Sequence, residues 1–203
     1  MAHYKGPKAR INRRLGEQIY DSTGAYKAST RRFSPPGQHG QRRRRLSDYG
    51  RALIEKQKIC HYYGLSLRQL KRFYTMAKRM PGNTGENLLC LCERRLDSVV
   101  WKAGLARTRA EARQSVAHGH FLVNGKRTTV PSYLVSPDDT IQLRKRDNLV
   151  KAYNARVEEV DRPSPAFLAV DKKEMAIKVI RVPDMEDVGL PVNVGPVVEF
   201  LSR

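Results

Sequence analysis

The residues best suited to binding chemistry are arginines beside a predicted helix start. Arg109 and Arg113 stand four residues apart on one helical face, Thr108 and Glu111 have the spacing of a capping box, and Arg107 precedes them. A helix start exposes unpaired amides and the positive end of its dipole, so phosphate is the natural ligand. Glu111 is the only acid in this stretch, although an ordinary solvent-exposed face of Arg and Glu is the alternative.

A small unit of two helices and three strands would position these arginines. Gly104 and Gly119 are placed to end the two helices, and Asn124-Gly125 is typical of a two-residue hairpin turn. The predicted elements are helices over 97–103 and 108–118 and strands over 121–123, 128–130 and 140–144. The unit is therefore α-α-β-β-β in order.

Residues 1–46 are rich in Gly, Pro, Ser and Arg and show no sustained period, which predicts a basic extended arm. Four adjacent arginines repel one another, so we expect the arm to become ordered on phosphate; they are Arg42, Arg43, Arg44 and Arg45. Four aromatic residues lie among the bases: Tyr4, Tyr20, Tyr26 and Phe33. They would either stack on RNA bases or anchor the arm against the body of the protein.

Apolar residues between 47 and 93 repeat with helical period, which predicts a small helical domain. Ser66 and Gln69 have capping-box spacing, and Arg68 and Arg72 lie on the basic face of the helix that follows. The predicted helices are one that ends near 64, one from 66 to about 81 and one over about 86–94.

The charge of the chain is strongly basic and unevenly distributed. Its 203 residues contain 39 Lys and Arg against 20 Asp and Glu, a net charge of +19. The net charge is +9 over 1–50, +6 over 51–100, +5 over 101–150 and −1 over 151–203. Such a gradient indicates a polyanionic partner, and nucleic acid is favoured over a membrane because no basic helix has a Trp/Phe-rich face. No apolar run exceeds five residues, so we expect a cytoplasmic protein without a membrane span.

Three cysteines, at 60, 90 and 92, are too few and too unevenly spaced for a disulfide framework, which indicates a reducing compartment. Their spacing does not fit the C-x2-C pattern that zinc sites favour, and apolar neighbours predict buried thiols. We therefore expect neither a metal nor a cofactor.

Several segments resemble a known family. They are YKGPKARINRRLG (4–16), SPPGQHGQRRRRLSDYGRALIEKQK (34–58), NTGENLL (83–89), RRLDSVV (94–100), GLARTRAEARQSVAHGHFLVNGKR (104–127), VPSYLVSPDD (130–139) and VEFLSR (198–203). Together they are similar to the bacterial form of the fourth small-subunit ribosomal protein family, and the α-α-β-β-β unit resembles its RNA-binding module. The chain has no cysteine before position 60, so it resembles the zinc-free branch of that family.

The resemblance implies a structural constituent of the small ribosomal subunit, which binds its RNA directly, nucleates assembly of the subunit body and contributes to translational accuracy. It places Arg107, Thr108, Arg109, Arg113, Asn124, Lys126 and Arg127 on the RNA-facing side, with Arg42 to Arg45 on the arm. His118 and His120 are either phosphate or ribose contacts or structural residues. We assign Arg68, Arg72 and Arg94 to RNA contact as well.

The C-terminal segment carries an acidic cluster that would repel phosphate and so would face protein: Asp184, Glu186 and Asp187. The resemblance implies that it meets neighbouring small-subunit proteins, notably the fifth, and that the protein is not a homo-oligomer. Residues 167–170 and 175–182 predict a hairpin that docks on the preceding module.

Two other classes of function, an enzyme and an RNA-binding protein outside the ribosome, account for fewer features of the sequence. Arg95-Leu96-Asp97 reproduces the tripeptide of pseudouridine synthases that carry a similar module, but too few residues follow the module for a catalytic domain. An RNA-binding protein outside the ribosome would not need the basic arm or the VEFLSR ending. We therefore expect no enzyme activity.

The sequence predicts an α+β fold with a strand-rich C-terminal segment. Its predicted parts are a basic N-terminal arm (1–46), a helical domain (47–93, with part of 158–203), an inserted RNA-binding module (94–157) and C-terminal strands with a tail (158–203).

Overall fold

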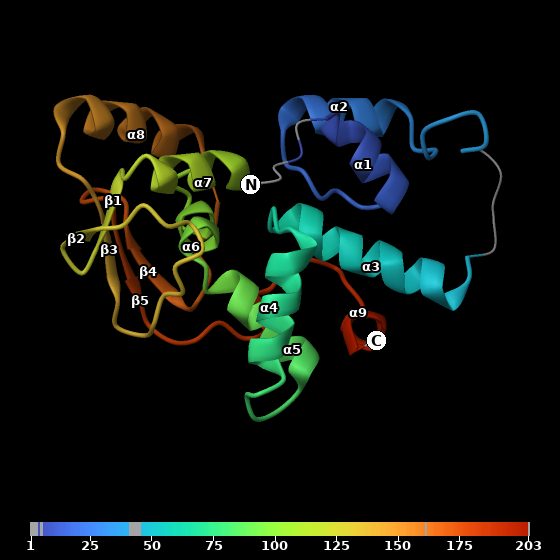
Figure 1. Ribbon diagram of the computed structural model, residues 1–203. Helices are drawn as coiled ribbons and strands as arrows, with labels where there is room; N and C mark the ends of the chain where they lie inside the picture. Colours follow the sequence, from blue (N-terminus) through green and yellow to red (C-terminus); the bar gives the residue numbers. More distant parts are fainter. Residues whose placement is uncertain (1–3, 5, 41–45, 161, 203) are drawn as a thin grey trace. The chain divides into compact units, whose positions relative to one another are not determined.

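The computed structural model describes residue 4 and residues 6–40, 46–160 and 162–202 (Figure 1). Its contacts divide the chain into two compact units: unit 1 comprises 1–88 and 190–203, and unit 2 comprises 89–189. Helices and an antiparallel sheet confirm the α+β class. These boundaries differ from the predicted ones, because the C-terminal hairpin belongs to the same sheet as the module.

The first helices of unit 1 are where the sequence-based expectation of an extended arm is wrong. Helices α1 (Lys8–Leu15) and α2 (Thr23–Arg31) pack together and bury four apolar side chains: Ile11, Leu15, Ile19 and Ala25. The Asn12 side chain closes their connection, since its Oδ1 accepts from the Ile19 and Tyr20 amides at 3.2 and 3.1 Å. Each helix is too short for its period to stand out in the sequence. Residues 6–40 therefore have a core of their own, while Arg42 to Arg45 lie outside the described residues.

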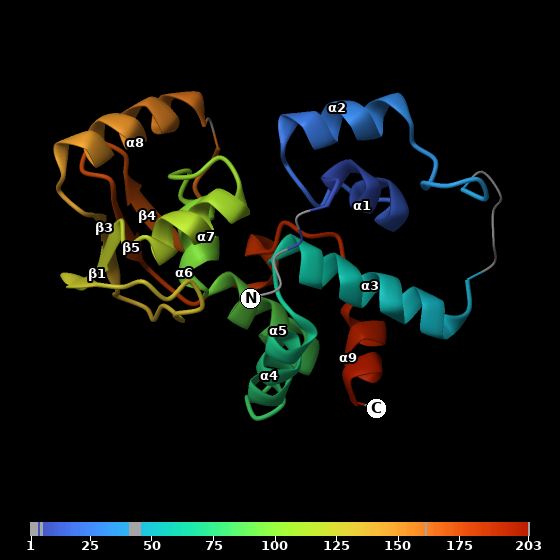
Figure 2. The ribbon, with the colours of Figure 1, turned by 45° about the horizontal axis from the view of Figure 1, so that its top comes forward.

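The remaining helices of unit 1 are α3 (Asp48–Tyr62), α4 (Leu67–Ala77), α5 (Thr84–Glu93, which continues into unit 2) and α9 (Val194–Ser202). The helices predicted in this region are confirmed, and so is the capping box: Ser66 Oγ accepts from Gln69 N at 3.3 Å and Gln69 Oε1 accepts from Ser66 N at 3.1 Å. Helix α9 was not predicted. It packs on α3, which explains why residues from both ends of the chain form one unit (Figure 2).

Unit 2 contains helices α6 (Leu96–Lys102), α7 (Arg109–Ala117) and α8 (Asp147–Glu159), a single turn η1 (Met185–Asp187), and strands β1 (Phe121–Val123), β2 (Lys126–Arg127), β3 (Thr140–Leu143), β4 (Leu168–Asp171) and β5 (Ala176–Val179). The sheet order is β2-β1-β3-β5-β4, with every pair antiparallel. The α-α-β-β-β order is confirmed. Helix α8 was not predicted, and the C-terminal hairpin extends the sheet through β5 instead of docking on it.

The β1–β2 hairpin has the predicted two-residue turn, with φ of 49° at Asn124 and 77° at Gly125. Val123 pairs with Lys126, so the returning strand starts directly after the turn and covers 126–127, not the predicted 128–130. The buried side of the sheet includes Phe121, against which the fully buried Tyr153 ring of α8 packs edge-on with centroids 5.7 Å apart. This contact fixes α8 beside the first strand.

No helix in the described ranges combines the length and apolar character needed to cross a membrane. The cysteines at 60, 90 and 92 carry thiols and form no disulfide; Cys92 is buried and the other two are half-buried. Burial raises the pKa of the Cys60 thiol to about 11. Within the part of the chain that the structure describes, no three His, Cys, Asp or Glu side chains are grouped to hold a metal ion.

Candidate nucleic-acid interface

The two arginines on α7 are turned inward, into a cluster of charged side chains. Arg109 is 13% exposed at its side chain; its Nη1 donates to Ser98 Oγ at 2.7 Å and its Nη2 lies 3.6 Å from Glu93 Oε1. Its guanidinium carbon lies 4.0 Å from the centroid of the Trp101 ring. Arg109 thus has partners within the protein on several sides.

Arg113 reaches a second buried acid. Its Nη1 lies 3.8 Å from Asp97 Oδ2, and the Asp97 carboxylate also accepts from Arg95 Nε and Nη2 at 2.9 and 2.5 Å. Burial lowers the pKa of the Arg113 guanidinium, against the opposing effect of Asp97. Because Asp97 is buried between these arginines, it lacks the access that a catalytic acid of a synthase would need.

We call this set the buried charge network: Glu93, Arg95, Asp97, Lys102, Arg109 and Arg113. Lys102 Nζ lies 3.4 Å from Glu93 Oε1, and burial lowers the pKa of this amine. Glu111 is the only acid within the stretch of the α7 arginines, and the fold adds Glu93 from α5 and Asp97 from α6 as their partners. The assignment of Arg109 and Arg113 to RNA contact stays a prediction.

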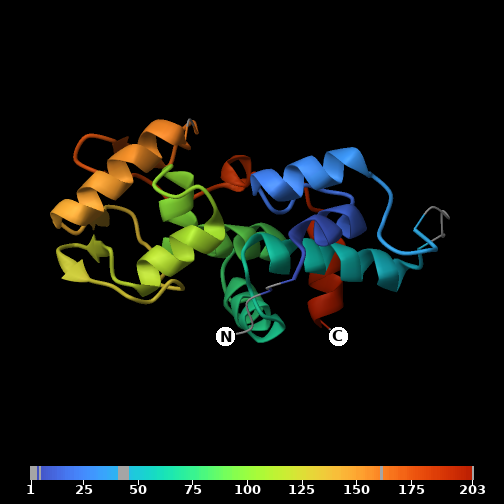
Figure 3. The ribbon, with the colours of Figure 1, turned by 90° about the horizontal axis from the view of Figure 1, so that it is seen from above.

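The ribbon of α7 (yellow-green) runs near that of α8 (orange) in Figure 3. Ion pairs link the start of α7 to α8. Thr108 Oγ1 caps the helix by accepting from Glu111 N at 3.2 Å. The Glu111 carboxylate accepts from Arg107 N at 2.9 Å, and not from Thr108 N as it would in a capping box. Arg107 is exposed and pairs with Glu159, and Arg156 Nε lies 3.1 Å from Glu111 Oε1. The phosphate site predicted at this helix start is thus partly occupied by acids of the protein itself.

A different part of unit 2 gathers basic side chains around Gly119, after the end of α7. A Cβ on Gly119 would lie only 2.4 Å from Arg127 Nε, so the guanidinium of the hairpin lies against the bare glycine backbone. The His118 and His120 rings flank this glycine with their centroids 5.8 Å apart. The sequence predicted these three side chains as RNA contacts, and the structure brings them together.

The same place is completed by the segment between β3 and α8. A cavity here is lined by His118, Gly119, His120, Arg144, Lys145, Arg146, Asp147, Asn148 and Leu149. Arg144 N donates to His120 O at 2.8 Å, which fixes the basic segment to the histidines. We call His118, Gly119, His120, Arg127 and residues 144–146 the basic corner. Asp147 is the one acidic residue among those that line the cavity.

The surroundings of His120 favour the neutral form of its imidazole. Burial lowers the pKa of its imidazole, and the charges of His118, Arg156 and Arg146 lower that pKa further. Its Nδ1 lies 3.2 Å from the hydroxyl of Tyr153, which holds the ring against α8. The two roles that the sequence left open for His120 are therefore compatible, because the ring is anchored by α8 and still lines the cavity.

Arg144, Lys145 and Arg146 are residues that the sequence analysis missed. The predicted strand ends at Arg144 and leaves the next two bases unassigned, although Asp147 follows them, with Leu149 and Tyr153 at helical spacing. That pattern would have indicated a helix start with three bases before it.

The other predicted RNA contacts are more dispersed. Asn124 donates to Asp139 Oδ1 at 2.8 Å and accepts from Thr140 N at 2.9 Å, so its amide ties the hairpin turn to β3. Lys126 is exposed on the same hairpin. Arg94 Nε donates to Val135 O at 2.9 Å. Arg68 and Arg72 lie on the exposed face of α4, in unit 1.

The predicted acidic contact surface is partly neutralised. Arg181 pairs with Asp184 and, at 3.0 Å, with the carboxylate of Asp187, whose side chain is largely buried. The Lys102 amine donates to the main-chain oxygen of Asp187. Glu186 is therefore the member of this acidic turn that is exposed without a role in closing it.

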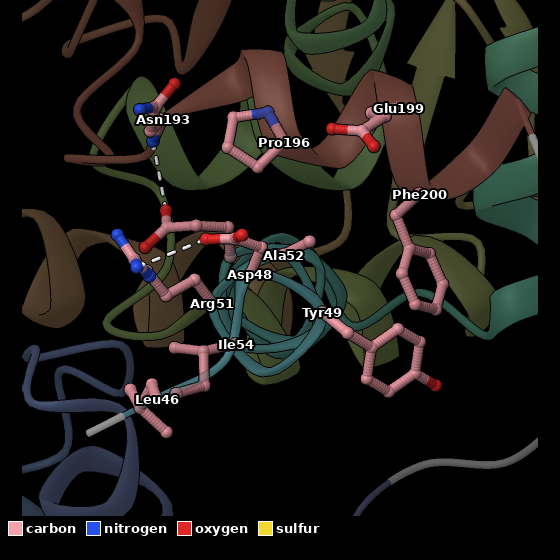
Figure 4. A pocket seen from close by; sticks show the side chains of 11 residues that line it. Leu46, Asp48, Tyr49, Arg51, Ala52, Ile54, Asn193, Pro196, Glu199 and Phe200 are labelled. Atoms are coloured by element: carbon pink, nitrogen blue, oxygen red, sulfur yellow. Dashed lines mark hydrogen bonds and ion pairs between the residues drawn. The ribbon is translucent and has the colours of Figure 1, made fainter. Parts of the chain in front are cut away.

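A groove in unit 1 offers a second surface that the sequence did not reveal. It lies between the start of α3 and α9, and Figure 4 shows the Tyr49 and Phe200 rings side by side at its edge, with centroids 5.6 Å apart. Tyr49 is 58% exposed. The acidic residues that line the groove are Asp48, Glu55 and Glu199. Arg51 also lines the groove and pairs with Asp48 at 3.1 Å, so three acids and one base leave the lining net acidic. This lining and the apolar edge suit a basic protein partner.

Comparisons with known proteins cover the whole chain. Residues 3–93 match the family described as the ribosomal protein S4/S9 N-terminal domain, and residues 94–141 match the S4 domain. Over the full length of both chains, small ribosomal subunit protein uS4 of Rhodopirellula baltica is 49% identical, that of Halothermothrix orenii 45% and that of Aquifex aeolicus 43%.

Proposed function

Because the chain belongs to the uS4 family of small ribosomal subunit proteins, we propose that it binds the RNA of the small subunit through the basic corner of unit 2. It is a structural, RNA-binding constituent of the small ribosomal subunit and not an enzyme. In bacteria, such proteins are found on ribosomes in the cytoplasm. The observation that carries the proposal is one cavity lined by two histidines, residues 144–146 and a single acid, with Arg127 against the Gly119 backbone beside it.

The chemistry of the corner suits a phosphate backbone. Guanidinium groups bind phosphate oxygens in a fork, and Arg146 stands at the N-cap of α8 without a capping side-chain bond, so first-turn amides of α8 can donate to the same anion. None of these groups reads a base edge in an A-form groove. We infer that the corner recognises RNA shape, as expected for a protein that binds early and helps to organise an RNA junction.

We propose further that the groove between α3 and α9, with Glu186 as a smaller acidic surface, contacts neighbouring small-subunit proteins, notably the fifth. The exposed Tyr49 and Phe200 rings supply apolar area, and acids around them suit a basic partner. Through this contact the protein would contribute to translational accuracy. We expect one copy per subunit and no homo-oligomer.

The experiment that tests the proposed function is RNA binding over a salt series, together with purification of washed small subunits. Each neutralised phosphate adds about −0.7 to −0.9 to the slope of log affinity against log salt, so a steep slope is expected. Junction RNA should compete better than a plain duplex of equal length. A flat salt response, or a chain that leaves the subunits during washing, would contradict the proposal.

The protein contact is tested with Tyr49→Ala and Glu186→Lys in reconstituted subunits. We expect both variants to retain rRNA affinity. Tyr49→Ala should weaken binding of the fifth protein more than Glu186→Lys does, because it removes apolar area that the contact would bury. Misreading of a reporter gene measures the effect on accuracy. Normal protein contact and accuracy in both variants, with weaker rRNA binding, would show that these surfaces face RNA instead.

A further inference from the structure

Two adjoining cavities in the first part of unit 1 share one arginine. The first cavity is lined by Arg10, Arg13 and Arg32 together with residues 34–38. The second is lined by Arg13 again, with the aromatic residues Tyr26 and Phe33 on its border. One cavity is therefore cationic and the next aromatic, and neither was identified by the sequence, which placed the phosphate contacts of this region at Arg42 to Arg45.

The cationic cavity is held in shape by the elements around it. Helix α1 buries Ile11 and Leu15, which leaves Arg10 and Arg13, three residues apart, at the border of its buried face. Arg13 Nε donates to Ser34 O at 2.8 Å and so fixes its guanidinium to the loop. The loop is tight, since a Cβ on Gly40 would lie 1.9 Å from the Pro35 carbonyl oxygen. The fold therefore holds Arg13 and the loop in place, and the exposed Arg10 and Arg32 complete the rim of the cavity.

The charge around this cavity has one sign. None of its lining residues is acidic, and residues 6–40 contain seven Lys and Arg against two acids. One of these acids, Glu17, lines the second cavity and lies 3.9 Å from Lys58 Nζ. Three guanidiniums around one concave loop form a site for a phosphate group.

The aromatic residues of this region divide into two pairs, one packed against the protein and one exposed. Tyr4 and Tyr20 pack against His61, with centroids 5.5 and 6.0 Å from its ring, and so anchor the segment. Tyr26 and Phe33 are 55% and 83% exposed. A ring as exposed as Phe33, directly between Arg32 and Ser34, is placed to stack on a base.

We propose that the two cavities bind one unpaired nucleotide of RNA, with its phosphate against Arg10, Arg13 and Arg32 and its base stacked on Phe33 beside Tyr26. Glu17 offers an acceptor for an amino group on the base edge. An acidic peptide would use the arginines but would leave Phe33 and Tyr26 in water. The inference rests on the proposed function, because it takes rRNA as the source of the nucleotide.

The test compares four variants of the full chain. Phe33→Ala removes the stacking surface, and Phe33→Trp keeps it. Arg10→Gln with Arg32→Gln removes two charges from the cavity and leaves the structural Arg13 in place, while Lys27→Gln with Arg31→Gln removes two exposed charges from α2 that line neither cavity. Circular dichroism and thermal unfolding check that each variant folds as the unsubstituted chain does.

The two halves of the site should respond differently to salt. Phe33→Ala should weaken binding of small-subunit rRNA about tenfold at every salt concentration, with an unchanged slope, because stacking releases no counterions. Phe33→Trp should bind normally. The Arg10 and Arg32 double variant should lose about tenfold or more and show a slope shallower by about one unit, whereas the Lys27 and Arg31 variant should lose at most a few-fold.

Protection of arginines from phenylglyoxal identifies the source of the phosphate. Bound rRNA should protect Arg10 and Arg32 but not Arg31. Inorganic tripolyphosphate at equal phosphate concentration should protect none of the three. Protection by tripolyphosphate as strong as that by rRNA, or equal effects of the two double variants, would overturn the proposal. So would normal rRNA affinity of Phe33→Ala. If the unsubstituted chain itself fails to bind rRNA, the proposed function has failed and not this site alone.

Discussion

Unit 2 contains two clusters of basic side chains that look alike in the sequence and differ in their surroundings. In the buried charge network, Arg95, Arg109 and Arg113 face Glu93 and Asp97. In the basic corner, Arg127 and residues 144–146 surround two histidines, with Asp147 as the acidic residue nearby. The first cluster has partners within the protein, whereas the bases of the second form no ion pair with the residues that the structure describes.

The difference shows what decides the role of an arginine. Arg109 and Arg144 are both bases in a basic segment, but Arg109 pairs with Glu93, which comes from another element, α5. Burial of a charge is tolerated only with such a partner, whereas an exposed cluster without one attracts a polyanion. The basic corner should therefore control RNA affinity, and the network should control stability.

The largest effect is expected from breaking the network. Asp97→Ala leaves the fully buried Arg95 guanidinium without its bidentate partner, so the free energy of unfolding should fall by about 3–5 kcal/mol. Urea unfolding followed by the fluorescence of Trp101, the single tryptophan, measures this in unit 2. Glu174→Ala removes an exposed acid as a control. A loss below about 1 kcal/mol would mean that the network is incidental.

Neutralising the basic corner should change rRNA binding and leave stability unchanged. Arg144→Gln with Arg146→Gln should make the salt slope of rRNA binding shallower by about 1.4 to 1.8, the value for two phosphates, and lower the affinity at least tenfold. The free energy of unfolding should be unchanged. Lys172→Gln with Lys173→Gln, in the exposed β4–β5 turn, is the control with equal loss of charge. Equal losses in both pairs would reduce the corner to general electrostatic attraction.

Signals within a few residues were sufficient to predict much of this architecture. The Ser66 and Gln69 capping box and the Asn124-Gly125 turn depend on neighbouring residues, and both were predicted correctly. Helix α8 was missed because the residue at its N-cap is Arg146, which is not a typical capping residue. The pairing of Arg109 with Glu93 could not be predicted, because no local rule brings residues of α5 and α7 together.

Arg107 is an intermediate case that sharpens the comparison. It is basic and exposed, but it pairs with an equally exposed acid, Glu159. Arg107→Gln should change the free energy of unfolding by less than about 1 kcal/mol, since exposed pairs contribute little. The salt slope of rRNA binding should fall by less than for the corner variant, because Glu159 already neutralises part of this charge. A slope change as large as that of Arg144→Gln with Arg146→Gln would place Arg107 in the corner.

The smallest effect is expected from pH. The pKa of His120 is lowered in the folded protein, so the unfolded chain takes up this proton first as the pH falls below 6.5. The free energy of unfolding should therefore decrease from pH 7 to lower pH, while rRNA affinity should rise once His120 becomes charged. Trp101 fluorescence and filter binding measure the two trends. His120→Gln should flatten both pH dependences, and substitution of the exposed His39 by Gln should change neither. Stability and rRNA affinity that fall together as the pH falls would contradict this role for His120.

The packing of α9 on α3 has a consequence for the order of synthesis. The ribosome makes α3 before α9, and all of unit 2 is made between them. A nascent chain can therefore close the sheet of unit 2 and present the basic corner before the groove beside Tyr49 and Phe200 exists. A chain released before α9 is translated keeps its RNA-binding surface and lacks this groove. A contact at the groove therefore requires a chain in which α9 has already been made.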